Sequence, residues 1–292
     1  MDKVKFLTDS GSDITFEEEK EYGIDIINFQ IALEDKSYLE RVDFTNEEFY
    51  KMIRESDQIP KTSQITTPRF EEKFLEYAKA GIEDLIVVLI NSTGSQTYDN
   101  AVLAKNNIYE ENPELESKFR IHIVDSHAYT LSYGYALIEA VKKHRAGASV
   151  QEILDYFDDW FKRVEIYIIP FDLRHLKKSG RVSAAAAFLG ELMGLKPVIS
   201  LIEGKSEVLK KVRGDKAVLY AGLDIIEKRL EQGGEYMILR TTADENTDLF
   251  IQEAEKRFGY PPVYQTYAGG VISTNTGPNM LGVVIRGKKR DR

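Results

Sequence analysis

The sequence predicts an α/β protein of two domains: an N-terminal three-layer domain with a mainly parallel sheet, and a C-terminal α+β domain. The first observation is that short apolar strands alternate with amphipathic helices over residues 1–163, which is typical of parallel βα units. The second is that residues 164–292 mix a hairpin with helices. We therefore place the domain boundary between residues 163 and 164.

Composition excludes several classes of protein. The chain has 292 residues, of which 42% are hydrophobic and 30% charged, as in an ordinary globular protein. A net charge of −9 argues against a nucleic-acid partner, and the absence of cysteine excludes disulfides and thiolate chemistry. The N-terminus has no signal-peptide pattern, and no apolar run approaches the ~20 residues that span a bilayer. We expect a cytoplasmic protein without stable membrane insertion.

The N-terminal elements follow from local patterns. Capping boxes at Thr15–Glu18, Thr45–Glu48 and Ser149–Glu152 mark three helix starts. The run 24–33 is strand-like, and residues 37–40 are expected to pair back on it as a hairpin. Further strands are predicted at 4–7, 85–90 and 120–124, and further helices at 69–80, 98–109 and 129–145.

The stretch 85–106 organises this domain. Residues 85–90 are all apolar, as in a strand buried on both faces, and the loop 91–97, NSTGSQT, leads into a helix. Backbone N–H groups at a helix start favour a phosphate or a carboxylate. The alternative is that Ser95 only caps the helix and the loop is an ordinary connection. In open parallel sheets ligands bind beyond the carboxyl ends of the strands, where the turns 8–13, 91–97 and 125–127 lie.

A second hydroxyl-rich stretch, IPKTSQITTP at 59–68, is bounded by prolines and fits neither regular period. Such a segment is usually a solvated connector. It bears on function only if it folds over the 91–97 loop.

The C-terminal half is predicted to contain a hairpin of strands 196–202 and 206–213, turned at 203–205. Two strand-like runs are expected around 269–278, where the chain turns through residues 273–279. The other predicted elements are strands 164–169 and 236–241 and helices 172–178, 184–193, 215–232 and 249–258.

The sequence shows no catalytic constellation. Ser95 is not in a G-x-S-x-G elbow, the four histidines lack metal-ligand spacing, and neither a phosphate loop nor a dinucleotide motif occurs. We therefore expect no catalytic residue, metal or cofactor. Arg181 and Arg213 lie in suggestive positions, although exposed surface charge is the commoner explanation of such arginines.

Eight motifs occur together in the order found in the DegV family, which the chain resembles over its whole length. The L-K-K-x-G-R-V-S block at 176–183, followed by Lys196-Pro197 and the V-R-G strand end at 212–214, is the most specific. The remaining motifs are Leu7-Thr8-Asp9-Ser10, Lys61-Thr62-Ser63-Gln64, Ser95-Gln96-Thr97-Tyr98, Val124-Asp125-Ser126 and Thr276-Gly277-Pro278.

The resemblance implies a DegV/EDD-like fold and a long-chain fatty acid as ligand, with no other cofactor. Several members of this family are the acyl-carrying subunit of bacterial fatty acid kinase. They present the carboxylate to a separate ATP-binding kinase subunit, and the acyl phosphate feeds phospholipid synthesis. The resemblance therefore implies a lipid-binding carrier subunit that has no chemistry of its own.

The resemblance also implies which residues hold the carboxylate. It assigns Thr62 and a hydroxyl of the 91–97 loop, which is Ser95 or, as the competing choice, Ser92. Arg213 matches an arginine near the head group and the kinase contact. Thr97, Asn275 and Thr276 complete the predicted ligand-binding set.

Two positions depart from the family pattern. Asn275 stands where the family often has a histidine; an amide forms hydrogen bonds but cannot titrate, so the head-group contact is expected to persist while kinase coupling is in question. Gln96 replaces the usual glycine of S-G-T. We expect a buried tunnel for the acyl chain, with walls from residues beside Ser95 and from Phe188, Leu189, Leu192 and Met193.

Two other functions remain open. The first is an enzyme of phosphoryl transfer or sugar-phosphate metabolism, which would use the helix start after 91–97 as a phosphate site. The second is a lipid sensor or chaperone whose ligand-filled state is recognised by a partner.

Overall fold

A parallel four-stranded sheet, sheet A, forms the centre of the N-terminal half. The computed structural model describes residues 3–184, 194–242 and 244–290. Sheet A has the order β2-β1-β6-β7, and every neighbouring pair is parallel. All six residues of β6 are buried, which confirms the prediction from the apolar run. The strands are β1 (Val4–Asp9), β2 (Ile24–Ile27), β6 (Asp84–Leu89) and β7 (Arg120–Asp125).

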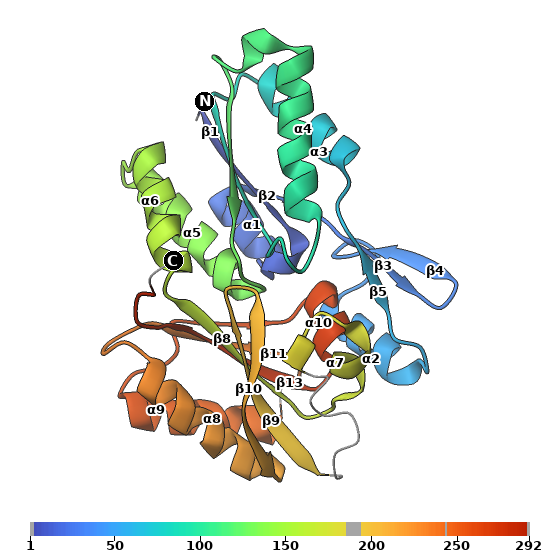
Figure 1. The fold of residues 1–292 in the computed structure, drawn as a ribbon, viewed down its shortest axis with the longest axis vertical. Coiled ribbons are helices and arrows are strands. Elements are labelled where there is room, and N and C mark those ends of the chain that lie inside the picture. The colour runs from blue at the N-terminus through green and yellow to red at the C-terminus, as the bar shows by residue number, and fades with distance from the viewer. Residues whose placement is uncertain (1–2, 185–193, 243, 291–292) are drawn as a thin grey trace.

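Helices cover both faces of sheet A, which gives the predicted three layers (Figure 1). On one side lie α3 (Thr67–Lys79) and α4 (Thr97–Glu111), and on the other α5 (Leu131–Arg145) and α6 (Val150–Phe161). The short helix α1 (Phe16–Tyr22) packs against α5 and β2. The predicted capping boxes are present at the starts of α1, α2 (Asn46–Glu55) and α6. Two 3₁₀ turns, η1 (Ser10–Ser12) and η2 (Pro113–Leu115), follow β1 and α4.

A small antiparallel sheet, sheet B, projects from this half. The predicted strand 24–33 is in fact two strands, because its second part leaves sheet A and pairs as β3 (Gln30–Leu33) between β4 (Lys36–Leu39) and β5 (Lys61–Ser63). The β3–β4 hairpin confirms the expected pairing. Strand β5 lies in the segment predicted to be irregular. Three polar residues carry no period, so only the pairing with β3 defines this strand.

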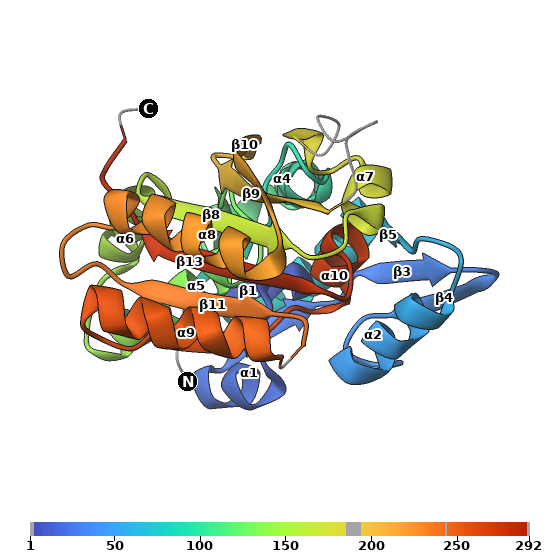
Figure 2. The ribbon, with the colours of Figure 1, turned by 90° about the horizontal axis from the view of Figure 1, so that it is seen from below.

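The C-terminal half is built on a mixed six-stranded sheet, sheet C, of order β10-β9-β8-β13-β11-β12. The predicted β9–β10 hairpin is present. Helices α8 (Asp215–Arg229) and α9 (Glu245–Phe258) lie along one face of the sheet (Figure 2), and its other face is turned toward the N-terminal half. The strands are β8 (Val164–Pro170), β9 (Leu195–Ile202), β10 (Lys205–Arg213), β11 (Tyr236–Arg240), β12 (Tyr264–Tyr267) and β13 (Met280–Arg286).

The expectation of two strand-like runs around 269–278 is wrong. Residues of this segment form the helix α10 (Gly270–Thr276), and the flanking strands are β12 and β13. The prediction failed because α10 is rich in β-branched residues and begins with glycine, both of which disfavour an isolated helix. Packing overrides these preferences, since all but one of its seven residues are buried.

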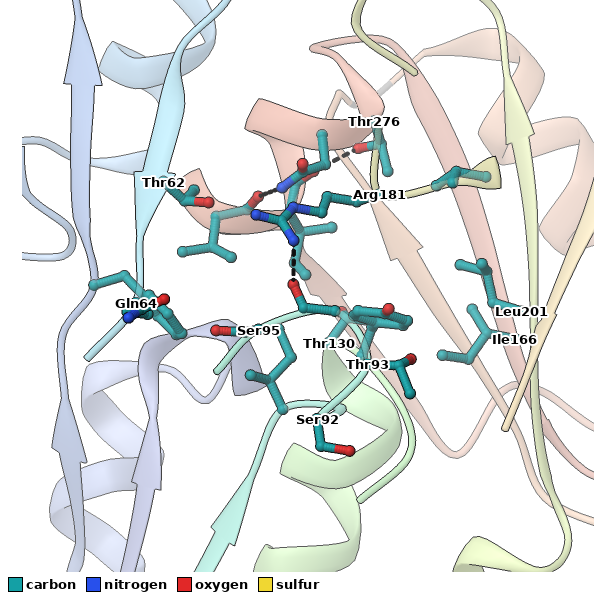
Figure 3. Close-up of a pocket in the computed structure, with 18 of the residues that line it drawn as sticks. Thr62, Gln64, Ser92, Thr93, Ser95, Thr130, Ile166, Arg181, Leu201 and Thr276 are labelled. Carbon is teal, nitrogen blue, oxygen red and sulfur yellow. Dashed lines mark hydrogen bonds between the residues drawn. The ribbon is translucent and has the colours of Figure 1, made fainter. Parts of the chain in front are cut away.

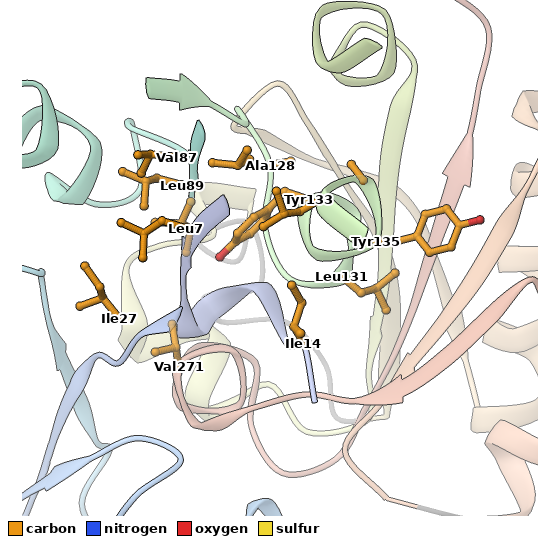
Figure 4. Close-up of a cluster of buried hydrophobic side chains, with 14 of the residues drawn as sticks. Leu7, Ile14, Ile27, Val87, Leu89, Ala128, Leu131, Tyr133, Tyr135 and Val271 are labelled. Atoms are coloured by element: carbon orange, nitrogen blue, oxygen red, sulfur yellow. The ribbon is translucent and has the colours of Figure 1, made fainter. Parts of the chain in front are cut away.

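Two hydrophobic cores meet at sheet C. One lies between the sheet and helices α8 and α9, and contains Tyr167 and Ile169 of β8. The other runs from sheet A to the opposite face of sheet C and contains Ile166 and Ile168. Figure 4 shows Val271 of α10 beside side chains of the N-terminal half in this second core. Alternate residues of β8 therefore belong to different cores, and the two halves share one of them.

Helix α7 (Arg174–Ser179) ends at Gly180 as predicted, with that glycine in the left-handed conformation. Most of the predicted helix 184–193 lies outside the described residues, and so do the predicted tunnel residues Phe188, Leu189, Leu192 and Met193. Within the described ranges, no helix has the length and apolar character needed to cross a bilayer.

Candidate functional site

The loop 91–96, at the carboxyl end of β6, is held by its own polar side chains. Asn91 is fully buried, and its Nδ2 donates to the Thr93 Oγ1 and to the Tyr129 hydroxyl, each at 2.8 Å. Asp125 Oδ1 accepts from the Ser92 N–H at 3.2 Å. A Cβ at position 94 would lie 2.5 Å from the Tyr129 hydroxyl oxygen, so a larger residue here would displace the Tyr129 ring. The loop is therefore held by its own Asn91 side chain and by Asp125 and Tyr129, which follow in the chain after β7 begins.

The segment 59–68 folds against this loop, so it is not a solvated connector. The Ile65 N–H donates to Thr97 Oγ1 at 3.2 Å, and Asn100 Nδ2 donates to the Ile65 carbonyl at 2.8 Å. Thr97 Oγ1 also lies 2.8 Å from Ser95 Oγ, which in turn accepts from the Thr97 N–H at 3.3 Å. The Ser95 side chain thus supports the start of α4.

A cavity of about 700 Å³ lies between the two halves, within the range usual for small-molecule sites. The lining residues that are exposed belong to the 59–68 segment, the 91–96 loop and Arg181, whereas the apolar lining residues are buried, so the cavity opens on this side. The lining residues divide into two kinds. The polar ones are Thr62, Ser63, Gln64, Thr66, Ser92, Thr93, Ser95, Gln96, Tyr129, Thr130, Arg181, Asn275 and Thr276.

The apolar wall comes mainly from sheet C. It consists of inward-facing residues on four neighbouring strands, together with α10 and single residues of the N-terminal half. These are Ile166 and Ile168 (β8), Leu201 (β9), Leu239 (β11), Met280 (β13), Val271 and Ile272 (α10), Phe29, Ile90 and Val182. The cavity is therefore amphipathic, with hydroxyls and amides at one side and a continuous aliphatic surface at the other.

Arg181 is the one side chain with a formal charge among the described lining residues. It follows Gly180, which ends α7, and its Nη1 donates to the Gly94 carbonyl at 2.9 Å. Figure 3 shows its side chain extending between α10 and the 91–96 loop. The hydroxyl of Tyr129 accepts from Asn91, and burial raises the pKa of Tyr129, so the hydroxyl keeps a proton to donate. A cation and several neutral donors suit an anionic group.

An open groove of about 730 Å³ adjoins the cavity and shares Thr62, Arg181 and Asn275 with it. Among its described lining residues, the cations are Lys61, Lys178 and Arg181, and the one acid is Asp57. The outer side of the opening is thus electropositive, although the chain as a whole is acidic.

The structure brings five of the seven predicted site residues together. Thr62, Ser92, Ser95, Asn275 and Thr276 all line the cavity. Ser95 lies on the same side of the opening as Thr62 and Gln64, whereas Ser92 lies nearer to β6 (Figure 3). Asn275 and Thr276 lie in the last turn of α10 rather than in the predicted turn.

The other two predicted residues lie elsewhere. Thr97 is fully buried behind Ser95. Arg213 is exposed at the end of β10, paired with Leu195, whereas the opposite end of this hairpin, at Gly204, packs on Asn91 and Thr93. Nine residues separate these ends, or roughly 30 Å along an extended strand. Arg181, not Arg213, is the arginine at the opening.

Sequence reasoning missed several lining residues. The sequence favours an exposed surface charge for Arg181, marks Gln64 and Thr93 only as members of polar stretches, and gives no signal for Thr130. The sheet C residues give no such signal, since residues 166–169 of β8 are all apolar and only the structure separates those that face the cavity from those that face α8 and α9. No group of three or more His, Asp or Glu side chains suited to a metal ion occurs in the described part of the chain.

The fold and the site together define an α/β ligand-binding protein with an amphipathic cavity between its halves. The family model described as "Uncharacterised protein, DegV family" matches residues 3–288, and the chain belongs to this family. A fatty acid-binding protein of Thermotoga maritima is 28% identical over 298 residues, covering 99% of this chain and all of the relative.

Solved structures agree with this assignment. A Thermotoga maritima protein whose structure reveals a fatty acid binding function is 26% identical, with a TM-score of 0.80 over 99% of this chain and 100% of that one. A fatty-acid-binding DegV family protein from Thermus thermophilus has a TM-score of 0.85 at 24% identity, over 98% and 99% of the two chains; at this identity the likeness establishes the fold.

Proposed function

We propose that this protein binds a long-chain fatty acid, with the acyl chain against the sheet C wall and the carboxylate between Thr62 and Ser95. The observation that carries the proposal is that the described lining residues divide one cavity into an apolar wall and a rim of neutral donors with one cation, Arg181. A fatty acid has the same division. The family membership and the fatty-acid-binding relatives support it.

The energetics favour the acyl chain as the source of affinity. Each buried methylene contributes ~0.8 kcal/mol, so a long chain gains on the order of 10 kcal/mol before ordering costs. The hydroxyl donors and Arg181 then need only orient the carboxylate, and their hydrogen bonds contribute ~1–3 kcal/mol to binding. We propose that the bound chain is enclosed as in a tunnel, with the carboxylate left at the open side.

We further propose that this cytoplasmic carrier presents the carboxylate to a separate ATP-binding kinase subunit, whose acyl phosphate product feeds phospholipid synthesis. Two observations support this. The polar rim is the side at which the cavity opens, and the adjoining groove carries Lys61, Lys178 and Arg181. Such an electropositive surface attracts a phosphorylated nucleotide held by a partner. The sequence itself provides no nucleotide-binding motif.

A phosphoryl-transfer or sugar-phosphate enzyme is the second candidate, because the start of α4 lies at the opening beside Arg181. The aliphatic wall is the observation against it, since a sugar phosphate would leave that surface unused. The two candidates therefore differ in the polarity of the bound molecule.

Extraction of the purified protein, followed by mass spectrometry, tests the proposal. We expect a fatty acid at close to one molecule per chain, and a phosphorylated polar metabolite in its place would refute the fatty-acid proposal. Adding a bacterial fatty acid kinase subunit with ATP then tests presentation. Acyl phosphate formation supports the carrier function, whereas bound lipid without turnover favours the sensor.

A further inference from the structure

Three carboxylates are buried together outside the cavity, where η1 faces α10. Asp9 and Glu40 are fully buried and Asp13 is 8% exposed. None of them lines the cavity. Their hydrogen-bond donors are neutral: Asp9 accepts from Tyr133 and two backbone N–H groups, Asp13 from Thr130 and Glu40 from Ser10, besides the bonds to α10 described next. Buried charge without a paired cation is costly, so this cluster calls for an explanation.

Two of these carboxylates hold the beginning of α10. Asp13 Oδ1 accepts from the Gly269 N–H at 2.8 Å, and Glu40 Oε1 accepts from the Val271 N–H at 2.7 Å. Both N–H groups belong to the first turn, which has no acceptor within the helix. A Cβ at position 269 would lie 2.8 Å from each of these two carboxylate oxygens, so glycine allows the close approach. The N-terminal half thus fixes a helix of the C-terminal half.

The same short helix forms one wall of the cavity. Val271, Ile272, Asn275 and Thr276 all line it. Asn275 Nδ2 donates to the Val271 carbonyl at 2.8 Å, and Thr276 Oγ1 donates to the Ile272 carbonyl at 2.9 Å. Because these polar side chains are bonded to their own helix, any shift of α10 moves them relative to Thr62 and Ser95.

Resting on the fatty-acid-binding function proposed above, we infer that Asp13 and Glu40 are positioning residues for the cavity. They hold α10 where Asn275 and Thr276 face the carboxylate of the bound lipid, although neither acid touches the lipid. Loss of either acceptor frees a first-turn N–H group and loosens the wall on which the head group rests.

The charge of the cluster makes this positioning sensitive to pH. Burial raises the pKa of Glu40 to about 7 and that of Asp9 to about 6, and it raises the pKa of Asp13 well above its usual value. An ionised carboxylate is the stronger acceptor, so α10 is held more firmly as the pH rises from 6 to 8. Besides the three acids themselves, the titratable and charged groups that act on the cluster are Arg41, Tyr50, Tyr133 and Tyr264. Arg54 and Tyr267 line an open pocket together with Asp13 and Glu40.

The test compares Glu40→Gln and Asp13→Asn with the unaltered protein, using oleic acid as probe at pH 6, 7 and 8. Each amide keeps an acceptor oxygen but removes the charge, so we expect affinity at pH 8 to fall roughly three- to tenfold. In Glu40→Gln the rise in affinity between pH 6 and 8 should flatten. A role confined to overall stability would not alter this pH profile.

Asp9→Asn is the matched control, because Asp9 is equally buried but its bonds go to Gly11, Ile90 and Tyr133 rather than to α10. We expect its affinity at pH 8 to stay within about twofold of the unaltered protein. Amide hydrogen exchange at Gly269 and Val271 gives a readout independent of lipid, and should be faster in Glu40→Gln and Asp13→Asn only.

Folded variants that keep both the affinity and the pH profile of the unaltered protein would overturn the inference. So would unchanged amide exchange in α10. If the unaltered protein bound no fatty acid, the proposed function would fail, while the exchange measurement would still decide whether the two acids hold α10.

Discussion

Replacing Ser95 by alanine is the most direct test of where the carboxylate lies. A hydrogen bond to a charged group contributes about 1.5–3 kcal/mol. Thr62 and Arg181 remain at the same open rim, where water also replaces lost bonds, so the lower end applies. With 1.4 kcal/mol for each factor of ten, the Kd for oleic acid should rise about tenfold. Binding persists, because the acyl chain supplies most of the free energy.

The same substitution has a structural effect that must be separated from binding. Ser95 Oγ accepts from the Thr97 N–H at the start of α4, and loss of such an acceptor costs about 0.5–1 kcal/mol of unfolding free energy. Thermal unfolding measured without lipid gives this contribution. Calorimetric titration of lipid-free protein with oleic acid gives the change in Kd.

Ser92→Ala is the control, since Ser92 lines the same cavity nearer to β6. We expect its Kd to change less than twofold. The opposite result, an unchanged Kd in Ser95→Ala and a tenfold rise in Ser92→Ala, would move the carboxylate to Ser92. Unchanged affinity in both variants would refute a head-group site on this loop.

Three further predictions concern the cation, the apolar wall and the buried acids. Arg181→Gln should weaken oleate binding roughly three- to tenfold at low salt and less at high salt, because an exposed charge is screened; equal losses at both would contradict this. Ile168→Trp places a ring where about three methylenes would lie, so oleate titrations should show a loss of ~2–3 kcal/mol while an eight-carbon acid is less affected; equal losses for both acids would argue against this wall. Because burial raises the pKa of Asp9 to about 6 and that of Glu40 to about 7, the native state binds more protons than the unfolded state between about pH 4 and 7, so urea unfolding should show stability falling as the pH rises through this window. Glu40→Gln should flatten that fall, and an undiminished slope would show that Glu40 is not the group responsible.

Elements defined by their own sequence were predictable. The three capping boxes, the buried strand β6 and the β9–β10 hairpin depend on residues within a few positions of one another, and all are present. Helix α10 and strand β5 depend on distant partners. The carboxylates that cap α10 are more than 200 residues away along the chain, and β5 is a strand only through β3.

The site divides in the same way. The loop at 91–97 could be recognised from the sequence because it lies between an apolar strand pattern and a helix pattern. The resemblance to the DegV family added Thr62 and Asn275. The choice between Arg181 and Arg213 could not be made from sequence, because it depends on how α7 lies against the 91–96 loop. The apolar wall is assembled from β8, β9, β11 and β13, and sheet order is not readable from one chain.

The polar and the apolar lining of the cavity between sheet A and sheet C come from different segments of the chain. This separation affects how ligand preference can change. In the complex proposed above, the carboxylate contacts residues between 62 and 96 and in α10, whereas the acyl chain contacts lining residues on strands between residues 166 and 280. Substitutions on those strands can lengthen, shorten or bend the available space while the anchoring groups stay in place. We therefore expect substitutions on these strands to change which acyl chain fits without changing how the carboxylate is held.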